Sequence, residues 1–187
     1  MFGGRSTFGT LQARYAVPPS GPITPVLEPR KKGPTIVLQF QKSMTIHAPV
    51  QQVFDYVANW SNLATIWPSL IEVKDIKRPP SGGGTFKYAY KMAGLLLEGK
   101  GEDIEYIAKE RIVTRMTGDL EGTIIFRFEP ADATTKVQFA FEYTAPAALL
   151  RKVGEPFITK LNEHEAALVL QNLQTYFEVA AIAPTIR

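Results

Sequence analysis

The 187-residue sequence predicts an α+β fold, in which an antiparallel sheet of about seven strands is covered by a long C-terminal helix. Three observations predict this fold. A β-rich segment, residues 35–46, is followed by two short helical segments, and six strand-like segments separated by turn signals come next. The last part of the chain, residues 147–179, has helical periodicity. Such an order is typical of a domain in which the sheet and the helices share one core.

The two short helices are predicted from local signals. The first begins at Pro49, because proline suits the first turn of a helix. Asn59 ends it and can cap the second helix, which extends to Trp67 and stops before Pro68. The apolar residues of the first helix recur at helical spacing, at Val50, Val53, Phe54 and Val57.

The six strand-like segments alternate between apolar and polar residues. They cover residues 70–77, 85–92, 95–106, 111–117, 122–129 and 135–143. One face of the predicted sheet carries the large apolar side chains Phe86, Tyr88, Tyr90, Met92, Ile124, Phe126, Phe128, Val137, Phe139, Phe141 and Tyr143. Charged residues such as Lys87 and Arg127 alternate with them, so the other face is expected to meet water.

The final helix is expected to kink at Pro156 or to begin only after a separate turn there. At about 100° per residue, one stripe of this helix collects Phe157, Ile158, Leu161, Leu168, Val169, Tyr176 and Val179. We expect this stripe to lie on the aromatic face of the sheet. Glu165 and Asn172 fall in the centre of the stripe, and His164 falls near its edge.

The sequence pI of about 9.1 comes from the N-terminal segment. Residues 1–34 hold five basic residues and one acidic residue, whereas the rest of the chain holds 16 basic and 17 acidic residues and has a net charge of −1. The segment is also rich in proline and glycine, so we expect an extended basic arm ahead of a domain at residues 35–187. Its charge makes an anionic membrane surface or an acidic protein the expected partner.

Composition excludes several classes of protein. With no cysteine, the chain can form no disulfide and no cysteine-ligated metal site, and its two histidines do not have zinc-site spacing, so we expect no metal and no cofactor. No apolar run is long enough for a secretory signal or a transmembrane helix. Nucleic-acid binding is not expected, because the predicted domain lacks a clustered positive face. We expect a cytoplasmic protein, with organelle targeting by the acid-poor N-terminus as the weaker alternative.

Residues 46–60, IHAPVQQVFDYVANW, and residues 67–73, WPSLIEV, carry a resemblance. Together with the order of elements, they resemble the START-like (SRPBCC) superfamily, which includes polyketide cyclase/dehydrase and lipid transport proteins. The resemblance covers about residues 35–180 and implies the helix-grip fold. It also implies an apolar cavity between the sheet and the C-terminal helix, which would hold a lipid, quinone, isoprenoid or polyketide-like compound. The superfamily contains binders, transporters and enzymes, so the resemblance does not select a reaction.

The candidate ligand-binding residues are those expected to line this cavity. They are Tyr88, Tyr90, Met92, Arg115, Phe126, Phe139, Phe141, Leu161, Glu165, Leu168 and Asn172. A few polar groups on an apolar wall can orient a small ligand. The alternative is that the same aromatic side chains simply fill the core.

Glu165 is the most informative polar residue of the final helix. A carboxylate on an apolar stripe needs a partner, water or a proton, and Arg115, Tyr88 and Tyr90 are possible partners. A modest rotation of the helix would instead bring Glu165 to the surface. Asn172 could donate a hydrogen bond to a ligand carbonyl. His164 is expected at the edge or the surface, although it could serve as a general acid or base.

Two apolar features have a structural and a functional interpretation. Trp60 and Trp67 are expected to anchor the second short helix on the sheet, and the alternative is that they gate a cavity or touch a membrane. The run Leu95–Leu97, together with Met92 and Leu120, could form a contact patch for a membrane or a protein partner.

Three functions remain open from the sequence. The first is a non-enzymatic module that binds or carries a hydrophobic small molecule. The second is a polyketide cyclase or dehydratase that uses Glu165, His164 or tyrosines for acid–base chemistry. The third is an assembly subunit that docks through residues 1–34.

Overall fold

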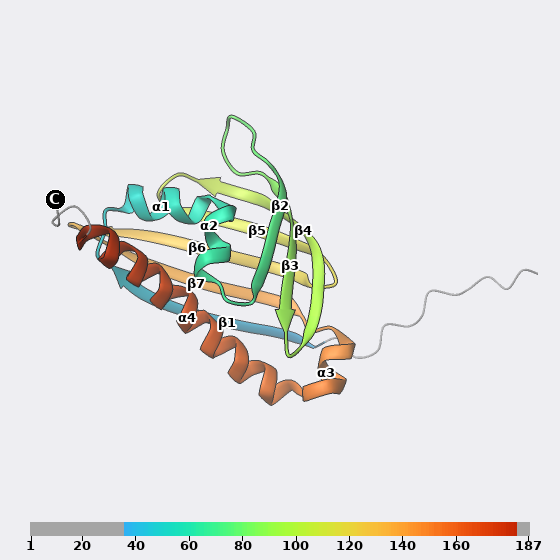
Figure 1. The fold of residues 1–187 in the computed structure, drawn as a ribbon. Coiled ribbons are helices and arrows are strands. Elements are labelled where there is room, and N and C mark those ends of the chain that lie inside the picture. Colours follow the sequence, from blue (N-terminus) through green and yellow to red (C-terminus); the bar gives the residue numbers. More distant parts are fainter. Residues whose placement is uncertain (1–35, 183–187) are drawn as a thin grey trace, which may run out of the picture. The chain divides into compact units, whose positions relative to one another are not determined.

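The computed structural model describes residues 36–182. The basic arm predicted for residues 1–34 lies outside the described residues. Eleven elements follow one another along the described chain (Figure 1): β1 (Val37–Ile46), α1 (Val50–Ala58), α2 (Trp60–Ile66), β2 (Leu70–Lys77), β3 (Thr85–Met92), β4 (Leu95–Ile107), β5 (Arg111–Gly118), β6 (Glu121–Ala131), β7 (Thr134–Thr144), α3 (Ala147–Val153) and α4 (Glu155–Ile182). The α+β fold predicted from the sequence is confirmed.

The seven strands form one antiparallel sheet in the order β1-β7-β6-β5-β4-β3-β2. The chain therefore returns to place β7 beside β1 and then continues into the last two helices. Helices α1, α2 and α4 pack on one face, which we call the inner face of the sheet, and α4 runs alongside β1 and β7 (Figure 1). The opposite face carries no helix of the described chain, and we call it the outer face.

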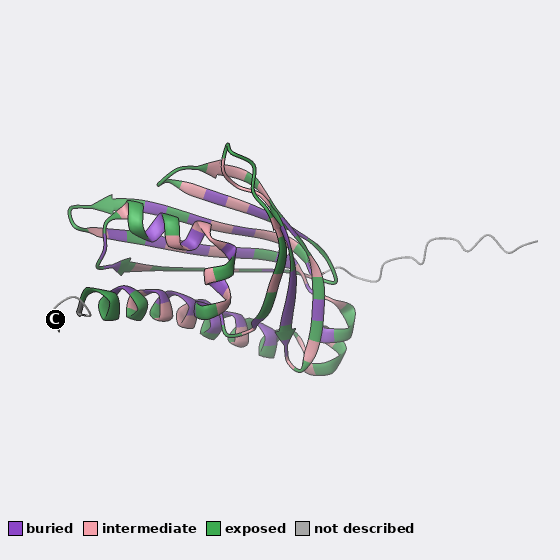
Figure 2. Cartoon of the chain, turned by 45° about the horizontal axis from the view of Figure 1, so that its top comes forward, coloured by how far each residue is buried: buried purple, intermediate pink, exposed green. Residues whose placement is uncertain are grey.

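The core lies between the inner face and the helices (Figure 2). The alternation predicted for the strands is observed, because Phe86, Tyr88, Tyr90 and Met92 of β3 are all buried. Phe126, Phe139 and Phe141 are also buried on the inner face, and Phe126 stacks on Phe139 with ring centroids 4.8 Å apart. These rings fill the centre of the molecule and give the helices an aromatic surface on which to pack.

The C-terminal segment differs from its prediction in the place of the interruption. Residues 147–179 form a short and a long helix, as the alternative of a separate turn near Pro156 predicted, but the break lies at Gly154, which has φ 78° between α3 and α4. Pro156 then lies in the first turn of α4, where its missing N–H costs nothing, so it does not kink the helix. The break is thus made by the glycine and not by the proline.

The buried face of α4 is also rotated from the predicted stripe. Ile158 and Val169 are buried as expected, whereas Phe157, Tyr176 and Val179 are 51%, 46% and 61% exposed. The positions that are buried include several that the stripe left out: Asn162, Ala166, Leu170, Leu173 and Phe177. The rotation has a physical reason: small Ala166 permits close packing, and the polar groups of Asn162 and Glu165 find hydrogen-bond partners inside.

The leucine patch proposed for Leu95–Leu97 does not form as a unit. Met92, Leu97 and Leu120 belong to the core, and Leu96 alone is strongly exposed. Alternation along β4 explains this result, because consecutive residues face opposite sides of the sheet. No helix within residues 36–182 is long and apolar enough to cross a membrane.

Candidate functional site

A carboxylate lies in the core between the sheet and α4. Glu165 is 6% exposed, and its side chain accepts two hydrogen bonds. Trp67 donates its indole N–H to Glu165 Oε1 at 2.9 Å, and Tyr90 donates its hydroxyl to Glu165 Oε2. We call Trp67, Tyr90 and Glu165 the Glu165 cluster. Because both carboxylate oxygens have a donor, the polar group can remain in an apolar interior.

Three separate elements position this cluster. Trp67 is the C-cap residue of α2, Tyr90 lies on the inner face of β3, and Glu165 lies in the first half of α4. The Trp67 ring makes edge-to-face contacts with Tyr90, at 5.9 Å between centroids, and with Phe139, at 5.2 Å. The aromatic contacts fix the plane of the indole, so its N–H points at the carboxylate.

A second polar pair lies in the same core. Asn162, three residues before Glu165 on α4, donates its side-chain amide to the Tyr143 hydroxyl at 2.8 Å. Tyr143 lies on β7 and also approaches Met92 Sδ at 3.8 Å. The core around Glu165 therefore holds the hydroxyls of Tyr90 and Tyr143, the Glu165 carboxylate and the Asn162 amide within a largely aromatic surrounding.

Tyr90 and Tyr143 are weaker acids than usual. Burial raises the pKa of Tyr143 to about 12. Burial, and then the charge of Glu165, raises the pKa of Tyr90 well above its ordinary value of 10.0. At neutral pH both hydroxyls stay protonated and can act as hydrogen-bond donors.

The pocket beside the Glu165 cluster is closed. It has a volume of about 10 Å³, which holds one water molecule at most. It is lined by Trp60, Trp67, Leu70, Phe86, Tyr88, Tyr90, Met116, Leu120, Ile124 and Phe141. The cavity expected from the sequence is thus filled by protein side chains in this conformation. A ligand can enter only if some of these side chains move.

Helix α2 is the element whose side chains fill the pocket from the helical side. Trp60, its first residue, and Trp67, its C-cap residue, are both buried, and Trp60 stacks on Phe86 with ring centroids 4.1 Å apart. Side-chain hydrogen bonds hold the helix at both ends. Trp60 donates to Asp103 Oδ2 at 3.2 Å, and Asn172 of α4 donates to the Ile66 carbonyl at 3.0 Å. With the Trp67–Glu165 bond, three hydrogen bonds fasten α2 over the pocket.

The structure brings most of the predicted ligand-binding residues to the inner face. Those buried there are Tyr88, Tyr90, Met92, Phe126, Phe139, Phe141 and Glu165, and those half-buried on α4 are Leu161, Leu168 and Asn172. Tyr88 does not contact Glu165, because its hydroxyl donates to the Leu120 carbonyl at 3.0 Å. The Asn172 amide, expected to meet a ligand carbonyl, instead binds the backbone of α2.

Arg115 is not part of this site. It is exposed on the outer face of β5, where it lies 3.6 Å from Glu102. The reason is strand alternation: Thr114 and Met116 are buried on the inner face, so Arg115 between them must point outward. Arg115 is therefore wrong as a partner of Glu165. His164 is exposed as well, which leaves Tyr90 as the predicted partner that contacts the carboxylate.

Three residues of the site were not foreseen in their roles. Trp67 was expected as an anchor but is also a donor, and a buried indole N–H is itself a signal that an acceptor must lie nearby. Asn162 can be assigned to the core only once it is known which face of α4 is buried. Asp103 follows the alternation of β4 and points to the inner face. Its carboxyl accepts hydrogen bonds from the Trp60 indole N–H and from the Thr114 hydroxyl, the latter at 2.6 Å. Burial raises the pKa of Asp103.

Comparison with protein families decides the affiliation. The family described as polyketide cyclase / dehydrase and lipid transport matches residues 37–178, which is nearly all of the described chain. The chain belongs to this family. A comparison with curated proteins finds no significant match. At the family level, membership is consistent with hydrophobic-ligand binding or polyketide cyclisation.

Solved structures share the fold. The Zhui aromatase/cyclase from Streptomyces sp. R1128 superposes with a TM-score of 0.63 at 16% identity, covering 76% of this chain and 94% of that one. A START superfamily protein from Mycobacterium smegmatis gives a TM-score of 0.64 at 14% identity, covering 76% and 98%. A protein from Thermus thermophilus gives 0.63 at 18%, covering 76% and 99%. At these identities the likeness concerns the fold alone.

Proposed function

We propose that this member of the family binds a hydrophobic small molecule between the inner face of the sheet and α4. The observation that supports the proposal best is the Glu165 cluster beside an apolar pocket. Burying a carboxylate costs free energy even when it is well paired. An aliphatic side chain of similar volume could fill the same space without this desolvation cost. A carboxylate kept there gives the pocket a polar end, which can receive a hydroxyl or other donor of an otherwise apolar ligand.

The aromatic walls favour a flat ligand. Trp60 stacks on Phe86, and Phe126 stacks on Phe139, so flat groups already pack face to face in the interior. A ring system of similar thickness can replace an indole in such a stack and recover its contacts. Hydroxylated aromatic polyketides and hydroxyquinones meet both requirements, a flat apolar body and a hydroxyl donor at its edge. Among the candidate ligands from the sequence, they fit these walls better than a saturated acyl chain.

Entry of the ligand requires α2 to move. This helix has only seven residues, too few for independent stability, and it depends on its tertiary contacts. Release of the Trp67–Glu165 and Asn172–Ile66 bonds would free its C-terminal end and withdraw an indole from the pocket. Glu165 would then lose one donor at the moment when a ligand hydroxyl could replace it. In this proposal the Glu165 cluster keeps the pocket closed before a ligand enters and then recognises the ligand.

Two measurements test this function. Native mass spectrometry and solvent extraction of freshly purified protein should find one apolar molecule per chain. Titration with emodin, decylubiquinone and oleate should then give saturable one-to-one binding for at least the flat compounds. An empty protein that binds none of the three would contradict the proposal.

The role of Glu165 is tested with a matched pair of variants. Glu165→Gln keeps the shape of the side chain but removes its charge, and it should weaken emodin binding about tenfold, the equivalent of one charge-assisted hydrogen bond. Glu163→Gln makes the same charge change on an exposed residue of the same helix and should leave the affinity unchanged. Equal affinities of the two variants would argue against a contact between Glu165 and the ligand.

A second candidate function is polyketide cyclisation or dehydration, favoured by the contact between a carboxylate and a protonated phenol. Glu165 would remove a proton from a carbon next to a ligand carbonyl, and Tyr90 would donate a hydrogen bond to the carbonyl oxygen. The raised pKa of Tyr90 keeps its proton available for this task. His164, the other predicted acid–base residue, is exposed and has no place in this reaction.

Turnover separates the two candidates. An enzyme should convert a linear poly-β-ketone analogue into a cyclic product, and Glu165→Gln should abolish this conversion while the analogue still binds. A carrier should bind the analogue and release it unchanged. A cytoplasmic location, and docking of residues 1–34 on a protein or an anionic membrane, remain predictions of the sequence.

A further inference from the structure

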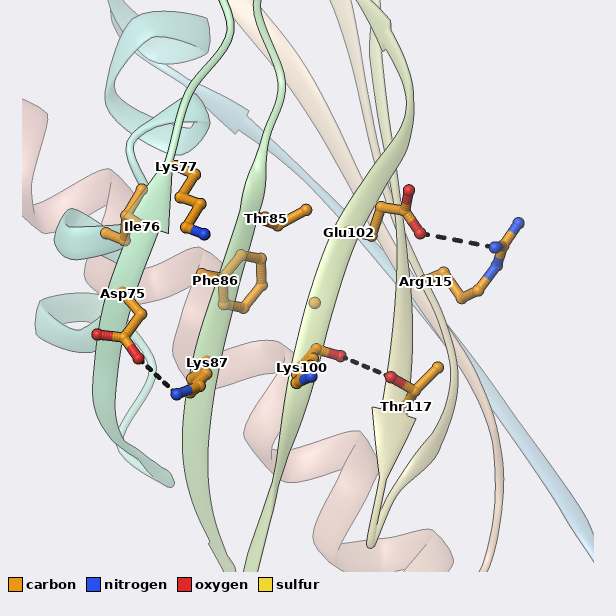
Figure 3. Close-up of a pocket in the computed structure, with 11 residues that line it drawn as sticks. Asp75, Ile76, Lys77, Thr85, Phe86, Lys87, Lys100, Glu102, Arg115 and Thr117 are labelled. Atoms are coloured by element: carbon orange, nitrogen blue, oxygen red, sulfur yellow. Dashed lines mark hydrogen bonds and ion pairs between the residues drawn. The ribbon is translucent and has the colours of Figure 1, made fainter.

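A hollow on the outer face lies away from the Glu165 cluster. It has a volume of about 620 Å³ and extends over β2, β3, β4 and β5 (Figure 3). We call it the outer groove. Its charged lining consists of the cations Lys77, Lys87, Lys100 and Arg115 and the acids Asp75 and Glu102, so cations exceed acids by two. A volume of this size falls within the range of roughly 300–1,000 Å³ that is typical of small-molecule sites.

The pairing register places three lysines side by side across the sheet. Lys74 of β2 lies opposite Lys87 of β3, which lies opposite Lys100 of β4, and Thr117 of β5 ends the row. Residues directly opposite one another in antiparallel strands have Cβ atoms about 4.5–5.5 Å apart. Like charges in such positions destabilise a sheet. A row of three lysines therefore lowers the stability of the folded protein unless anions lie beside it.

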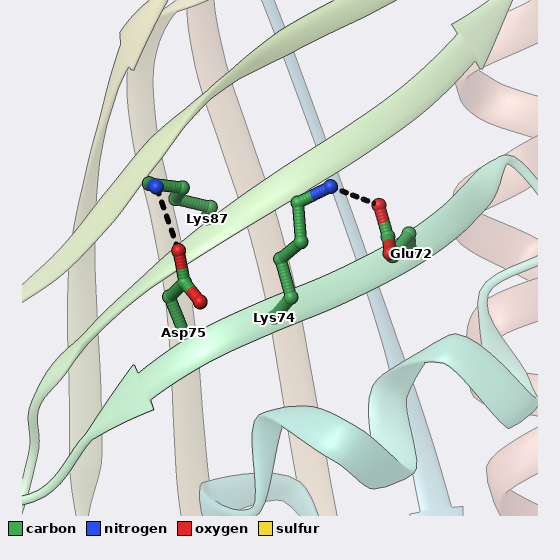
Figure 4. Close-up of polar contacts among 4 residues, drawn as sticks. All are labelled: Glu72, Lys74, Asp75 and Lys87. Carbon is green, nitrogen blue, oxygen red and sulfur yellow. Dashed lines mark hydrogen bonds and ion pairs between the residues drawn. The ribbon is translucent and has the colours of Figure 1, made fainter.

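Acidic neighbours neutralise two of these lysines. Lys74 Nζ lies 2.7 Å from Glu72, and Lys87 Nζ lies 2.6 Å from Asp75 (Figure 4). Asp75 reaches Lys87 because it lies in an irregular part of β2, with φ 53°, between the register positions of Lys74 and Lys77. Within residues 36–182, neither Lys100 nor Lys77 has an ion pair with an acidic side chain.

From this arrangement we propose that the outer groove binds a small molecule that carries two or more phosphate groups. Lys100 would contact one phosphate, and Lys77 or Arg115 would contact a second. Thr85 also lines the groove and offers a hydroxyl donor, whereas the Thr117 hydroxyl donates to the Lys100 carbonyl at 3.4 Å. Bound phosphates would give Lys100 the anionic partner that the described part of the protein does not supply.

Charges beside the row favour a small polyanion over a long one. The neighbouring row of the outer face holds Glu72 of β2, Ala89 of β3 and Glu98 of β4. Glu102 lies on the opposite side of the lysine row. A nucleic-acid strand or a flat anionic membrane would extend over these acids and be repelled, whereas a compact ligand stays within the basic part.

The test uses tripolyphosphate and isothermal titration calorimetry on the full chain. The wild type should bind one tripolyphosphate, and Lys100→Gln should weaken binding about tenfold, the equivalent of one charged contact. Lys91→Gln is the matched control, because Lys91 is exposed on the same face of β3 but outside the groove, and this variant should bind as the wild type does. Thermal melts of both variants without ligand check that each is folded.

The stability of Lys100→Gln gives an independent readout. Removal of the Lys100 charge should leave its melting temperature unchanged or higher without ligand, and tripolyphosphate should raise the melting temperature of the wild type more than that of the variant. Absence of binding, or equal weakening by Lys100→Gln and Lys91→Gln, would overturn the proposal. Binding of phosphoinositide vesicles or of an oligonucleotide without binding of tripolyphosphate would also overturn it.

Discussion

Trp67 donates its indole N–H to Glu165 across 98 positions of sequence, at a distance of 2.9 Å, and both residues are buried. This bond joins the end of α2 to α4 over the apolar pocket. It therefore links the stability of the closed conformation to the group that we propose for ligand recognition. A change at either residue should alter both properties.

Replacement of Trp67 by Phe removes the donor but keeps an aromatic ring. Glu165 then retains Tyr90 alone, so the free energy of unfolding should fall by about 1–3 kcal/mol, the cost of leaving a buried polar group short of a partner. Urea unfolding measures the loss. The double variant Trp67→Phe/Glu165→Leu should lose less than the sum of the single variants, because both partners are then absent. Additive losses would show that the two side chains are not coupled.

Alkaline pH should destabilise the protein through its buried tyrosines. Tyr143 has a pKa of about 12 in the folded protein and an ordinary value of 10.0 in the unfolded chain, so the folded state holds its proton more tightly. The contribution is fully present below pH 10 and is lost as the pH rises from 10 to 12, because the unfolded state releases the proton first. Urea unfolding at about pH 8, 10 and 11 tests the trend.

Tyr143→Phe should reduce this alkaline loss, whereas Tyr176→Phe, which changes an exposed ring of α4, should not. Tyr88 has a folded-state pKa of about 12 as well, so Tyr143→Phe removes only part of the effect. An unfolding free energy that stays constant between about pH 8 and 11 would contradict the assigned burial of these hydroxyls.

Replacement of Asn172 by Ala should loosen α2 without disturbing the core. The change deletes the hydrogen bond to the Ile66 carbonyl, which is worth about 1 kcal/mol. Hydrogen exchange of the α2 amides should accelerate, and emodin should bind with a faster association rate. Gln171→Ala, at the exposed neighbouring position, should change neither rate. Unaltered exchange in α2 would mean that this bond does not hold the helix.

Replacement of Gly101 by Ala should disturb the stack of Phe86 on Trp60. A Cβ at position 101 would overlap the Phe86 ring, which is buried and has little room to move. The expected loss of stability is about 1–3 kcal/mol, typical of an overpacked core. Glu98→Ala, on the outer face of the same strand, should be tolerated. Equal stability of the two variants would show that the Phe86 ring can move aside without loss of packing.

Strand alternation made the sheet predictable from the sequence. Phe86, Tyr88 and Tyr90 differ in side chain from Lys87 and Ala89 so plainly that the inner face of β3 could be assigned at once. The same rule applied to β5 would have placed Arg115 outside, next to buried Thr114 and Met116. Arg115 matches Glu165 in charge, but its place in the alternation of β5 sets it on the opposite face of the sheet.

The helix was less predictable, because large apolar residues occur around much of α4. The predicted buried face included Phe157, Tyr176 and Val179. The face that packs on the sheet instead includes Ala166, Leu170 and Leu173. Glu165 was expected inside and is buried, yet its donor Trp67 could not be chosen from the sequence. That choice depends on how α2 lies against α4, and such a contact between distant segments leaves no periodic pattern in the chain.

The two indole N–H signals of the protein give the most direct test of the proposed ligand site. Trp60 and Trp67 are the two tryptophans of the sequence, so a ¹⁵N-correlated NMR spectrum should show two indole resonances, which a Trp67→Phe variant assigns. Saturating emodin should shift or broaden the Trp67 resonance as the bond to Glu165 is exchanged for the ligand. An unchanged Trp67 resonance at ligand concentrations that saturate every detectable site would contradict ligand binding at Glu165.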